Sequence, residues 1–250
     1  MATYTVSDLH GQYHIFQKLL EKIRFSEDDF MYVLGDAIDR GPDGIKLLQT
    51  IKDAPNMELL IGNHEFMMLN AVAPDGSTDN FPGKDAALWL FSNGGEITFE
   101  QYKGLPTEER QSLLEWLNSR VLTTLVEVSD KTFCLTHSYY NVGYIDVPFR
   151  EIDYPAVWNI VWMTPYRPDI FVPVSNYTEN GWQFIIGHVP VQRIAGIGSG
   201  FSAHHEENIT LIDGGCAYRG HSLLADNECG VICLKLDDMS ETALTFAECE

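Results

Sequence analysis

The sequence predicts an α/β fold in which two central mixed β-sheets form a sandwich that is flanked by helices. The first third of the chain alternates short strand-like runs with helical patterns, which is typical of parallel strands joined by helices. The last third carries several further strand-like runs that are separated by turn residues. Because no repeat, low-complexity tract or linker divides the sequence, we expect one domain that spans residues 1–250.

The first third contains three predicted strands and two predicted helices. We expect strands at residues 3–6, 30–34 and 57–61, which are rich in apolar, β-branched and aromatic residues. Residues 13–23 place apolar side chains at helical spacing and therefore predict a helix. Asp43 is the predicted N-cap of a second helix. This order of elements predicts a parallel sheet with right-handed crossover connections.

The remaining two thirds pass from predicted helices to predicted strands. The helices are expected at residues 86–91 and 107–118, and the strands at residues 123–128, 132–136, 184–186, 209–212, 231–236 and 244–246. Residues 138–182 are rich in aromatic side chains, and we expect a cap-like region that packs over a sheet there. The glycines at 196, 198 and 200 indicate a turn, and the polar residues 204–207 indicate a solvated loop.

The charge of the chain excludes some classes of partner. The formal net charge is −20, from 36 acidic and 16 basic residues. Such a chain repels nucleic acid and anionic membrane surfaces at long range, so we expect neither as a partner.

The cysteines and the N-terminus predict a cytoplasmic protein. Five cysteines are an odd number, and free thiols are typical of a reducing compartment. The first residues lack the basic and then apolar pattern of a signal peptide. No apolar run approaches the ~20 residues that span a bilayer.

Residues of metal-binding type follow the predicted strands at the point where each strand ends. They are Asp8 and His10 after the first strand, Asp36 and Asp39 after the second, Asn63 and His64 after the third, and His137, His188 and Asp213 after later strands. Because α/β sheets bind ligands beyond the carboxyl ends of their strands, we expect one rim of the fold to gather these side chains. Mixed oxygen and nitrogen donors suit Mn, Fe or Zn better than Ca. Any one of these residues alone fits a turn or a capping position equally well, so the prediction depends on the whole set.

Five short motifs resemble those of the metallophosphoesterases of the calcineurin-like superfamily. They are S-D-L-H-G at 7–11, G-D-A-I-D-R-G at 35–41, G-N-H-E at 62–65, T-H-S at 136–138 and G-H-V-P at 187–190. More narrowly, the set resembles the phosphoprotein phosphatase family of serine/threonine phosphatases in its small bacterial and phage form. W-L-F-S-N-G-G at 89–95, together with Thr98, and I-D-G-G-C at 212–216 resemble stretches of the bacterial branch. The likeness covers residues 3–231 and implies the metallophosphoesterase fold.

The resemblance implies a role for each matching residue. Asp8 and His10 would hold one metal ion, Asp36 would bridge two ions, and Asn63, His137 and His188 would complete the second site. His64 would donate a proton to the leaving group, and Asp39 would orient His64. Arg40 would place its guanidinium fork on two phosphate oxygens. The implied cofactors are two divalent transition-metal ions, with Mn expected in vitro and Fe or Zn as alternatives.

A second phosphate-binding arginine is expected between the last two metal histidines. Arg150 and Arg167 are the candidates. The stretch from Trp162 to Arg167 resembles the tryptophan-then-arginine stretch of the family, which favours Arg167 as the catalytic residue, although the spacing here is longer. The chain also has Ser7 where the family has a leading glycine in its first motif.

The resemblance implies a dimetal-dependent phosphoester hydrolase, and we expect a serine/threonine protein phosphatase, with dual specificity left open. Its substrate would be a phosphoprotein or a phosphorylated small molecule. A diadenosine-tetraphosphate (dinucleoside polyphosphate) hydrolase is the alternative, because it shares these motifs. The acidic chain favours a peptide over a polyanionic dinucleotide, whereas the aromatic residues at 138–182 could stack on adenine. A non-catalytic scaffold of the same fold would be expected to lose His64, Asp39 or a ligand, and this chain keeps them all.

Overall fold

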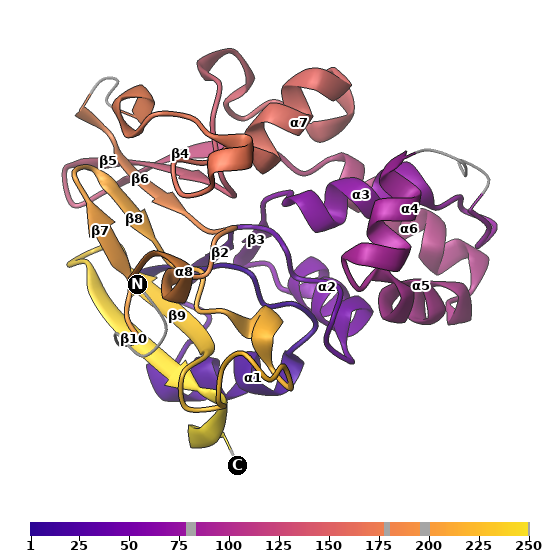
Figure 1. Ribbon diagram of the computed structural model, residues 1–250, viewed down its shortest axis with the longest axis horizontal. Helices are drawn as coiled ribbons and strands as arrows, with labels where there is room; N and C mark the ends of the chain where they lie inside the picture. Colours follow the sequence, from indigo (N-terminus) through magenta and orange to yellow (C-terminus); the bar gives the residue numbers. More distant parts are fainter. Residues whose placement is uncertain (79–83, 178–180, 196–200, 250) are drawn as a thin grey trace.

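The computed structural model describes residues 1–78, 84–177, 181–195 and 201–249, which form two five-stranded sheets (Figure 1). The first sheet has the order β10-β9-β1-β2-β3, and the second has the order β4-β5-β6-β8-β7. The first sheet contains β1 (Thr3–Val6), β2 (Phe30–Val33), β3 (Met57–Leu59), β9 (Gly230–Lys235) and β10 (Ser240–Thr245). The second contains β4 (Thr123–Val128), β5 (Lys131–Thr136), β6 (Gln183–Ile186), β7 (His204–Glu206) and β8 (Ile209–Leu211).

Both sheets are mixed, as the sequence predicted. In the first sheet β1, β2 and β3 run parallel, whereas β9 pairs antiparallel with β1. This pairing brings the last strands of the chain beside its first strand. In the second sheet β5, β6 and β8 run parallel, and β4 and β7 add antiparallel edges. The carboxyl ends of six parallel strands therefore become available to carry side chains of a site.

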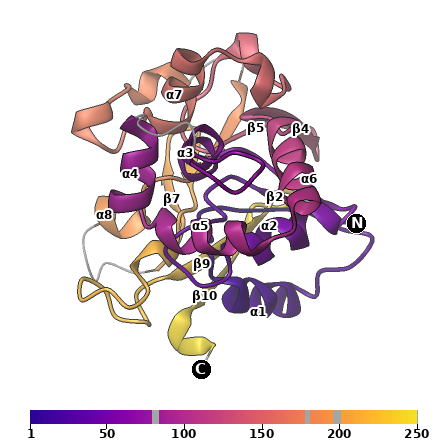
Figure 2. The same ribbon diagram turned by 90° about the vertical axis from the view of Figure 1, so that its right-hand side faces the viewer.

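Helices α1 (Tyr13–Ile23) and α2 (Gly44–Asp53) cover the outer side of the first sheet, and further helices extend beyond it (Figure 2). The further described helices are α3 (Asn63–Ala71), α4 (Lys84–Ser92), α5 (Gly95–Gly104), α6 (Thr107–Asn118), α7 (Tyr154–Trp162) and α8 (Val191–Ala195). Figure 1 places α7 beside the second sheet, within the aromatic-rich stretch. Among the described helices, none combines the length and the apolar composition that a membrane span requires.

Apolar side chains form two layers of core. One layer packs α1 and α2 against the first sheet; Ile15, Phe16 and Leu19 on α1 are buried there. The other layer lies between the two sheets, where Ile232 of β9 joins Phe184 of β6. Burial of these faces drives the sheets together. The predicted sandwich of two sheets is confirmed.

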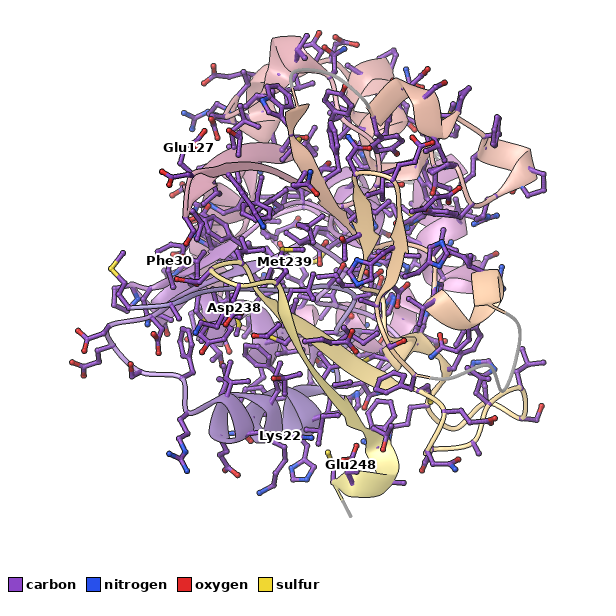
Figure 3. The ribbon with its side chains drawn as sticks, turned by 90° about the vertical axis from the view of Figure 1, so that its left-hand side faces the viewer. Lys22, Phe30, Glu127, Asp238, Met239 and Glu248 are labelled. Carbon is purple, nitrogen blue, oxygen red and sulfur yellow. The ribbon has the colours of Figure 1, made fainter. Side chains whose placement is uncertain are left out.

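Residues near the C-terminus of the chain contact helix α1 through an ion pair and a hydrogen bond. Lys22 Nζ on α1 lies 3.5 Å from Glu248 Oε1 and donates a hydrogen bond to the carbonyl oxygen of Ala243 on β10. Figure 3 shows Lys22 on α1 and Glu248 near the C-terminal end of the chain. The contact therefore supports the position of β10 at the edge of the first sheet.

Several predicted elements match their observed bounds, and others were missed. Strand β1, helices α1 and α6 and strand β4 have the predicted limits. Asp43 occupies the N-cap of α2, but its side chain accepts no capping hydrogen bond from that helix. Helices α3, α5, α7 and α8 were not predicted. In α3, Phe66, Met67 and Met68 are all buried, so the helix shows no amphipathic stripe.

The prediction of a solvated loop at residues 204–207 was wrong. Residues 204–206 form β7, which pairs antiparallel with β8 at the edge of the second sheet. An edge strand exposes one side to solvent and can carry polar side chains, so the polar composition of residues 204–206 did not predict a strand. The predicted turn at glycines 196, 198 and 200 lies outside the described residues.

Candidate metal centre

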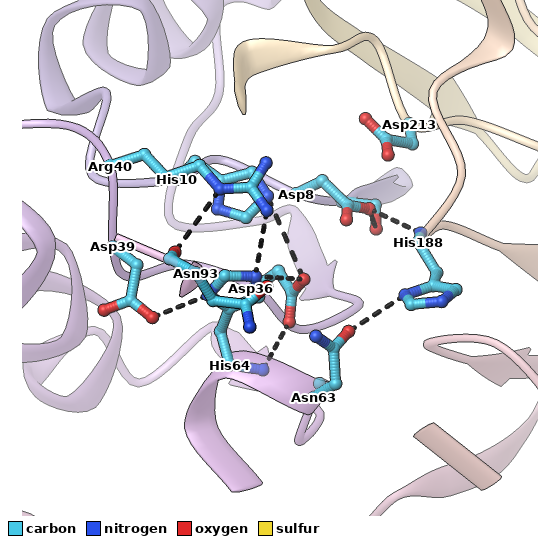
Figure 4. Close-up of polar contacts among 12 residues, drawn as sticks. Asp8, His10, Asp36, Asp39, Arg40, Asn63, His64, Asn93, His188 and Asp213 are labelled. Carbon is cyan, nitrogen blue, oxygen red and sulfur yellow. Dashed lines mark hydrogen bonds and ion pairs between the residues drawn. The ribbon is translucent and has the colours of Figure 1, made fainter. Parts of the chain in front are cut away.

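The predicted ligand residues meet where strands of both sheets end (Figure 4). Asp36 lies at the centre of the group. Its Oδ2 atom is 3.9 Å from His10 Nε2 and 3.5 Å from His137 Nε2. Asn63 Oδ1 lies 2.9 Å from both His137 Nε2 and His188 Nδ1. Two sets of donor atoms, each within 4.8 Å, share Asp36: one adds His10 and His64, and the other adds His137 and His188.

Asp8 joins the same group through the backbone of His188. The N–H of His188 donates to Asp8 Oδ2 over 3.0 Å, and Ser7 Oγ donates to the same carboxylate oxygen. Ser7 therefore contacts Asp8 directly. Gly187 leaves the space for this contact, because a Cβ atom there would overlap with Ser7 Oγ and Asp8 Oδ2.

The backbone of the site is strained. The residues with positive φ include Asp8, His10, Asp36, Asp39, Arg40 and His188, with φ between 44° and 72°. Residues other than glycine rarely adopt this conformation, and each instance costs on the order of 1–3 kcal/mol. Backbone hydrogen bonds hold the turns: the N–H of His10 donates to Asp36 O over 2.9 Å, and that of Gly41 donates to His10 O over 3.0 Å. Strain of this kind clusters at functional sites, because it aims side chains that a relaxed turn would turn away.

Burial sets the protonation of the cluster. It raises the pKa of Asp36 well above its usual value, and the nearby Asp8 carboxylate adds to the effect. Burial, and then the charge of Arg40, hold the pKa of His10 well below its usual value. Burial also lowers the pKa of His188 strongly. The lowered pKa values of His10 and His188 favour the neutral imidazole, which keeps a lone pair for a ligand.

One unpartnered atom supports a fit to metal ions. Asp8 Oδ1 is buried and has no hydrogen-bond partner among the described residues. Leaving a buried polar atom unpaired is costly unless another ligand satisfies it. Carboxylate, amide and imidazole donors around a shared Asp36 suit two divalent transition-metal ions. The set comprises Asp8, His10, Asp36, Asn63, His137 and His188.

His64 and Asp39 form a buried pair beside the cluster. His64 Nδ1 lies 2.6 Å from Asp39 Oδ2, and both side chains are buried. Burial raises the pKa of Asp39 to about 7. Burial, and then the charge of Arg40, lower the pKa of His64 well below its usual value. His64 Nε2 faces the cluster, 3.7 Å from Asp36 Oδ2.

The segment from Trp89 to Thr98 holds this pair in place. Trp89 Nε1 donates to Asp39 Oδ2 over 2.7 Å, and the backbone N–H of Asp39 donates to Thr98 Oγ1 over 2.9 Å. Gly95 lets the indole of Trp89 pack this closely, because a Cβ atom there would overlap with the ring. The sequence motif at 89–98 is thus a support for Asp39.

Arg40 is anchored by the same segment and extends over His64. Its backbone N–H donates to Gly94 O over 3.2 Å, and its Nε lies 3.5 Å from Asn93 O. Its Nη2 lies 3.4 Å from His64 Nε2. The guanidinium therefore borders the space above the cluster, as Figure 4 shows.

A cavity of about 130 Å³ opens over the cluster, and the two candidate arginines differ in their relation to it. Arg167 lines this cavity, together with Trp162 and Arg40. Its guanidinium is also bound to Asp169, with Nη2 2.6 Å from Oδ2. Arg150 instead lines a separate groove with Leu69 and forms an ion pair with Glu151. The geometry brings Arg167 to the site and leaves Arg150 outside it.

Sequence reasoning expected Asp213 at this rim and missed two other residues of the cavity. Asp213 follows the end of β8 and lines the cavity, as its placement after a predicted strand indicated. Arg193 and Tyr218 also line it, although neither was assigned a role. Arg193 and Tyr218 come from short segments whose approach to the cavity no local pattern could predict.

A comparison with known families settles the class of this site. Residues 1–232 match the family model described as calcineurin-like phosphoesterase. The chain belongs to the calcineurin-like phosphoesterase family. The expected recognition and fold are confirmed, and membership implies a dimetal centre for which the clustered His and Asp side chains provide donors.

The chain is also similar to part of several bacterial proteins of known name. A relative from Dechloromonas aromatica, named symmetrical bis(5′-nucleosyl)-tetraphosphatase, is 31% identical over 140 residues, which are 55% of this chain and 44% of the relative. The chain spans less than half the length of the curated relatives it matches.

Two solved structures share the fold of this phosphoesterase. One was assigned provisionally as a diadenosine tetraphosphatase; it has a TM-score of 0.60 and 14% identity and covers 97% of this chain and 92% of its own. The other, a cold-active protein-tyrosine phosphatase from a psychrophilic Shewanella species, has a TM-score of 0.54 and 16% identity and covers 96% and 79%. Such low identities show a common fold and do not distinguish substrates.

Proposed function

We propose that this chain is a dimetal-dependent hydrolase of dinucleoside polyphosphates, with diadenosine tetraphosphate or a close analogue as substrate. The observation that carries the proposal is the charge of the cavity. Arg40, Arg167 and Arg193 line it in a chain of net charge −20. Concentrating three guanidiniums here favours a ligand with several negative charges over one with a single phosphate.

The curated relatives support this substrate class over the protein phosphatase that we expected first. Their printed name is that of a symmetrical bis(5′-nucleosyl)-tetraphosphatase. The expectation of a phosphopeptide relied on the acidity of the whole chain, whereas binding depends on the charge at the site itself. The serine/threonine phosphatase stays an untested prediction, and the experiment below includes it.

The proposed ligands are the six residues named above, with Asp8 and His10 for one ion, Asp36 as the bridge, and Asn63, His137 and His188 for the other. When bound, the ions would polarise the phosphoryl group and lower the pKa of water. Mn is the expected metal in vitro, with Fe or Zn as alternatives. We also propose that residues 138–182 cap a single domain, since Trp162 and Arg167 of this stretch line the cavity.

Residues around the ions would bind the phosphate and protonate the leaving group. Arg40 orients the reacting phosphate with its guanidinium fork. His64 gives a proton from Nε2 to the leaving oxygen, while Asp39 keeps the ring in place through Nδ1. Burial and the charge of Arg40 lower the pKa of His64, and the negative charge of a bound phosphate would raise it again and favour the protonated ring. Trp89 and Thr98 fix Asp39, so they are positioning residues.

A parallel activity screen tests the proposal. Diadenosine tetraphosphate, a phosphoserine/phosphothreonine peptide and a phosphotyrosine peptide are compared with added Mn. We expect the highest kcat/KM for the dinucleotide. Asp36→Asn is the control for contaminating phosphatases, because it removes the central carboxylate. A peptide that is hydrolysed faster than the dinucleotide by the wild type, but not by the control, would overturn the proposal in favour of a protein phosphatase.

A further inference from the structure

Arg193 contributes to the positive charge of the cavity, but no particular phosphate contact has been assigned to it above. It lies on α8, five residues after His188, and Arg40 reaches the cavity from the turn after β2. The two guanidiniums are therefore carried by segments that follow strands of different sheets. Arg193 is part of the wall that also contains Tyr218 and Pro190.

The backbone that carries Arg193 is firmly placed. The neighbouring Gln192 is buried, and its Nε2 donates to Gly214 O over 3.0 Å and to Glu228 O over 2.8 Å. The N–H of Val191 donates to Asp213 O over 3.0 Å. These bonds fix α8 to the turn after β8. A short helix held in this way can present a side chain at a constant position.

The side chain of Arg193 is oriented by Tyr218. Its Nε donates to Tyr218 Oη over 2.6 Å, and the backbone N–H of Tyr218 donates to Gly215 O over 2.9 Å. Among the described residues no carboxylate lies within ion-pair distance of Arg193, and neither of its Nη groups has a hydrogen-bond partner. Arg167, by contrast, is bound to Asp169. Arg193 thus places two Nη groups without a partner among the described residues at the cavity, in an orientation set by Tyr218.

Arg193 and Arg167 contribute charge to the same region. The pKa of Asp169 is lowered, chiefly by its hydrogen bonds from Arg167 and also by the charge of Arg193. Arg40 lies instead over His64. Arg193 therefore adds positive charge to the side of the cavity that carries α8, where Asp213 is also a lining residue.

We propose that Arg193, oriented by Tyr218, binds the phosphoryl group adjacent to the one that is hydrolysed, and so selects polyphosphate chains over single phosphates. This inference rests on the proposed function and names the residue that would determine its specificity. A substrate with one phosphate places its charge at the metals and Arg40 and leaves Arg193 unused. A second phosphoryl group extends beyond the metals and meets the free fork of Arg193, where a charge-assisted bidentate bond is strong.

The test compares AMP and ADP as competitive inhibitors of the hydrolysis of an aryl phosphate in excess Mn. The two nucleotides differ by one phosphoryl group, so the ratio of their inhibition constants isolates the proposed contact. Arg193→Gln should raise the inhibition constant of ADP by about fivefold to tenfold, because a partly exposed charged hydrogen bond is lost, and should leave that of AMP unchanged. Tyr218→Phe, which only frees the guanidinium, should give a smaller change in the same direction. Arg150→Gln removes an equal charge outside the cavity and is the matched control.

Each outcome decides the proposal. A selective loss of ADP affinity in Arg193→Gln supports it. Equal losses for AMP and ADP would assign Arg193 to the reacting phosphate instead, and no loss, or a wild type that binds ADP no better than AMP, would overturn it. The inhibitors require no turnover of a dinucleotide. A chain that fails to hydrolyse diadenosine tetraphosphate but shows the selective loss would disprove the proposed function and retain the subsite.

Discussion

Replacing His64 with asparagine separates proton donation from metal binding. His64 is buried, its Nδ1 is 2.6 Å from Asp39 Oδ2, and its Nε2 faces the cluster 3.7 Å from Asp36 Oδ2. Asparagine can keep a hydrogen bond to Asp39 but cannot transfer a proton from the position of Nε2. If His64 is the general acid, the variant should keep two metal ions and lose turnover.

The size of the loss should depend on the leaving group. For an alkyl phosphate such as a phosphoserine peptide, the leaving alkoxide needs a proton, and loss of a general acid costs about 10²- to 10⁴-fold in kcat. That factor corresponds to about 3–5 kcal/mol of transition-state stabilisation. For diadenosine tetraphosphate the leaving group is itself a phosphate, whose second pKa is about 6, so it departs with little protonation. The loss there should be less than about tenfold.

The assay measures kcat for both substrates together with the metal content of the purified variant. Trp89→Phe is the companion variant, since it removes the 2.7 Å hydrogen bond to Asp39 Oδ2 together with part of the buried ring, and should give a smaller loss with the same dependence on the leaving group. An equal loss for both substrates with metals retained would refute proton donation. Loss of one metal ion would show instead that His64 is a ligand, as its position in the cluster with His10 and Asp36 allows.

Four further predictions follow from the site. Elemental analysis of the Mn-loaded protein should give two ions per chain, and Asp36→Asn should lower that content. Arg40→Ala should raise KM and weaken inhibition by free phosphate while the metals remain, and unchanged values of both would exclude a phosphate contact. In a double-mutant cycle, Arg40→Ala and Arg167→Ala should be non-additive, because both would act on one phosphate; strict additivity with a larger defect in Arg150→Ala would move the role to Arg150. In EDTA, the stability contributed by Asp39, whose pKa is raised to about 7, should be complete below about pH 4 and lost as the pH rises through 7; urea unfolding of Asp39→Asn should lack this part of the pH dependence.

Much of the fold could be predicted because its signals are local. Residues 13–23 and 107–118 have the observed limits of α1 and α6, since an amphipathic stripe or a preceding proline depends only on near neighbours. Helix α3 was missed because burial on all sides removes the stripe. Strand β7 was missed because its polar side chains reflect an edge position that only the assembled sheet defines.

The sequence by itself determined the family and predicted which residues would serve as metal ligands. The motifs around Asp8, Asp36, Asn63 and His188 are each compact, and their order along the chain was sufficient to predict that they meet. Parallel strands place their carboxyl ends at one edge, so the identity of a residue after each strand carries information about the site.

Only the tertiary structure decided how the remaining side chains are used. It brought Arg167 to the cavity and left Arg150 in another groove, although both lie between His137 and His188 along the chain. It also placed Trp89 against Asp39 and Arg193 beside Tyr218. Such contacts join segments that are far apart in sequence, and they depend on how helices pack on sheets. Burial, strain and the local charge of a cavity arise in the same way, because each is a property of the packed chain as a whole.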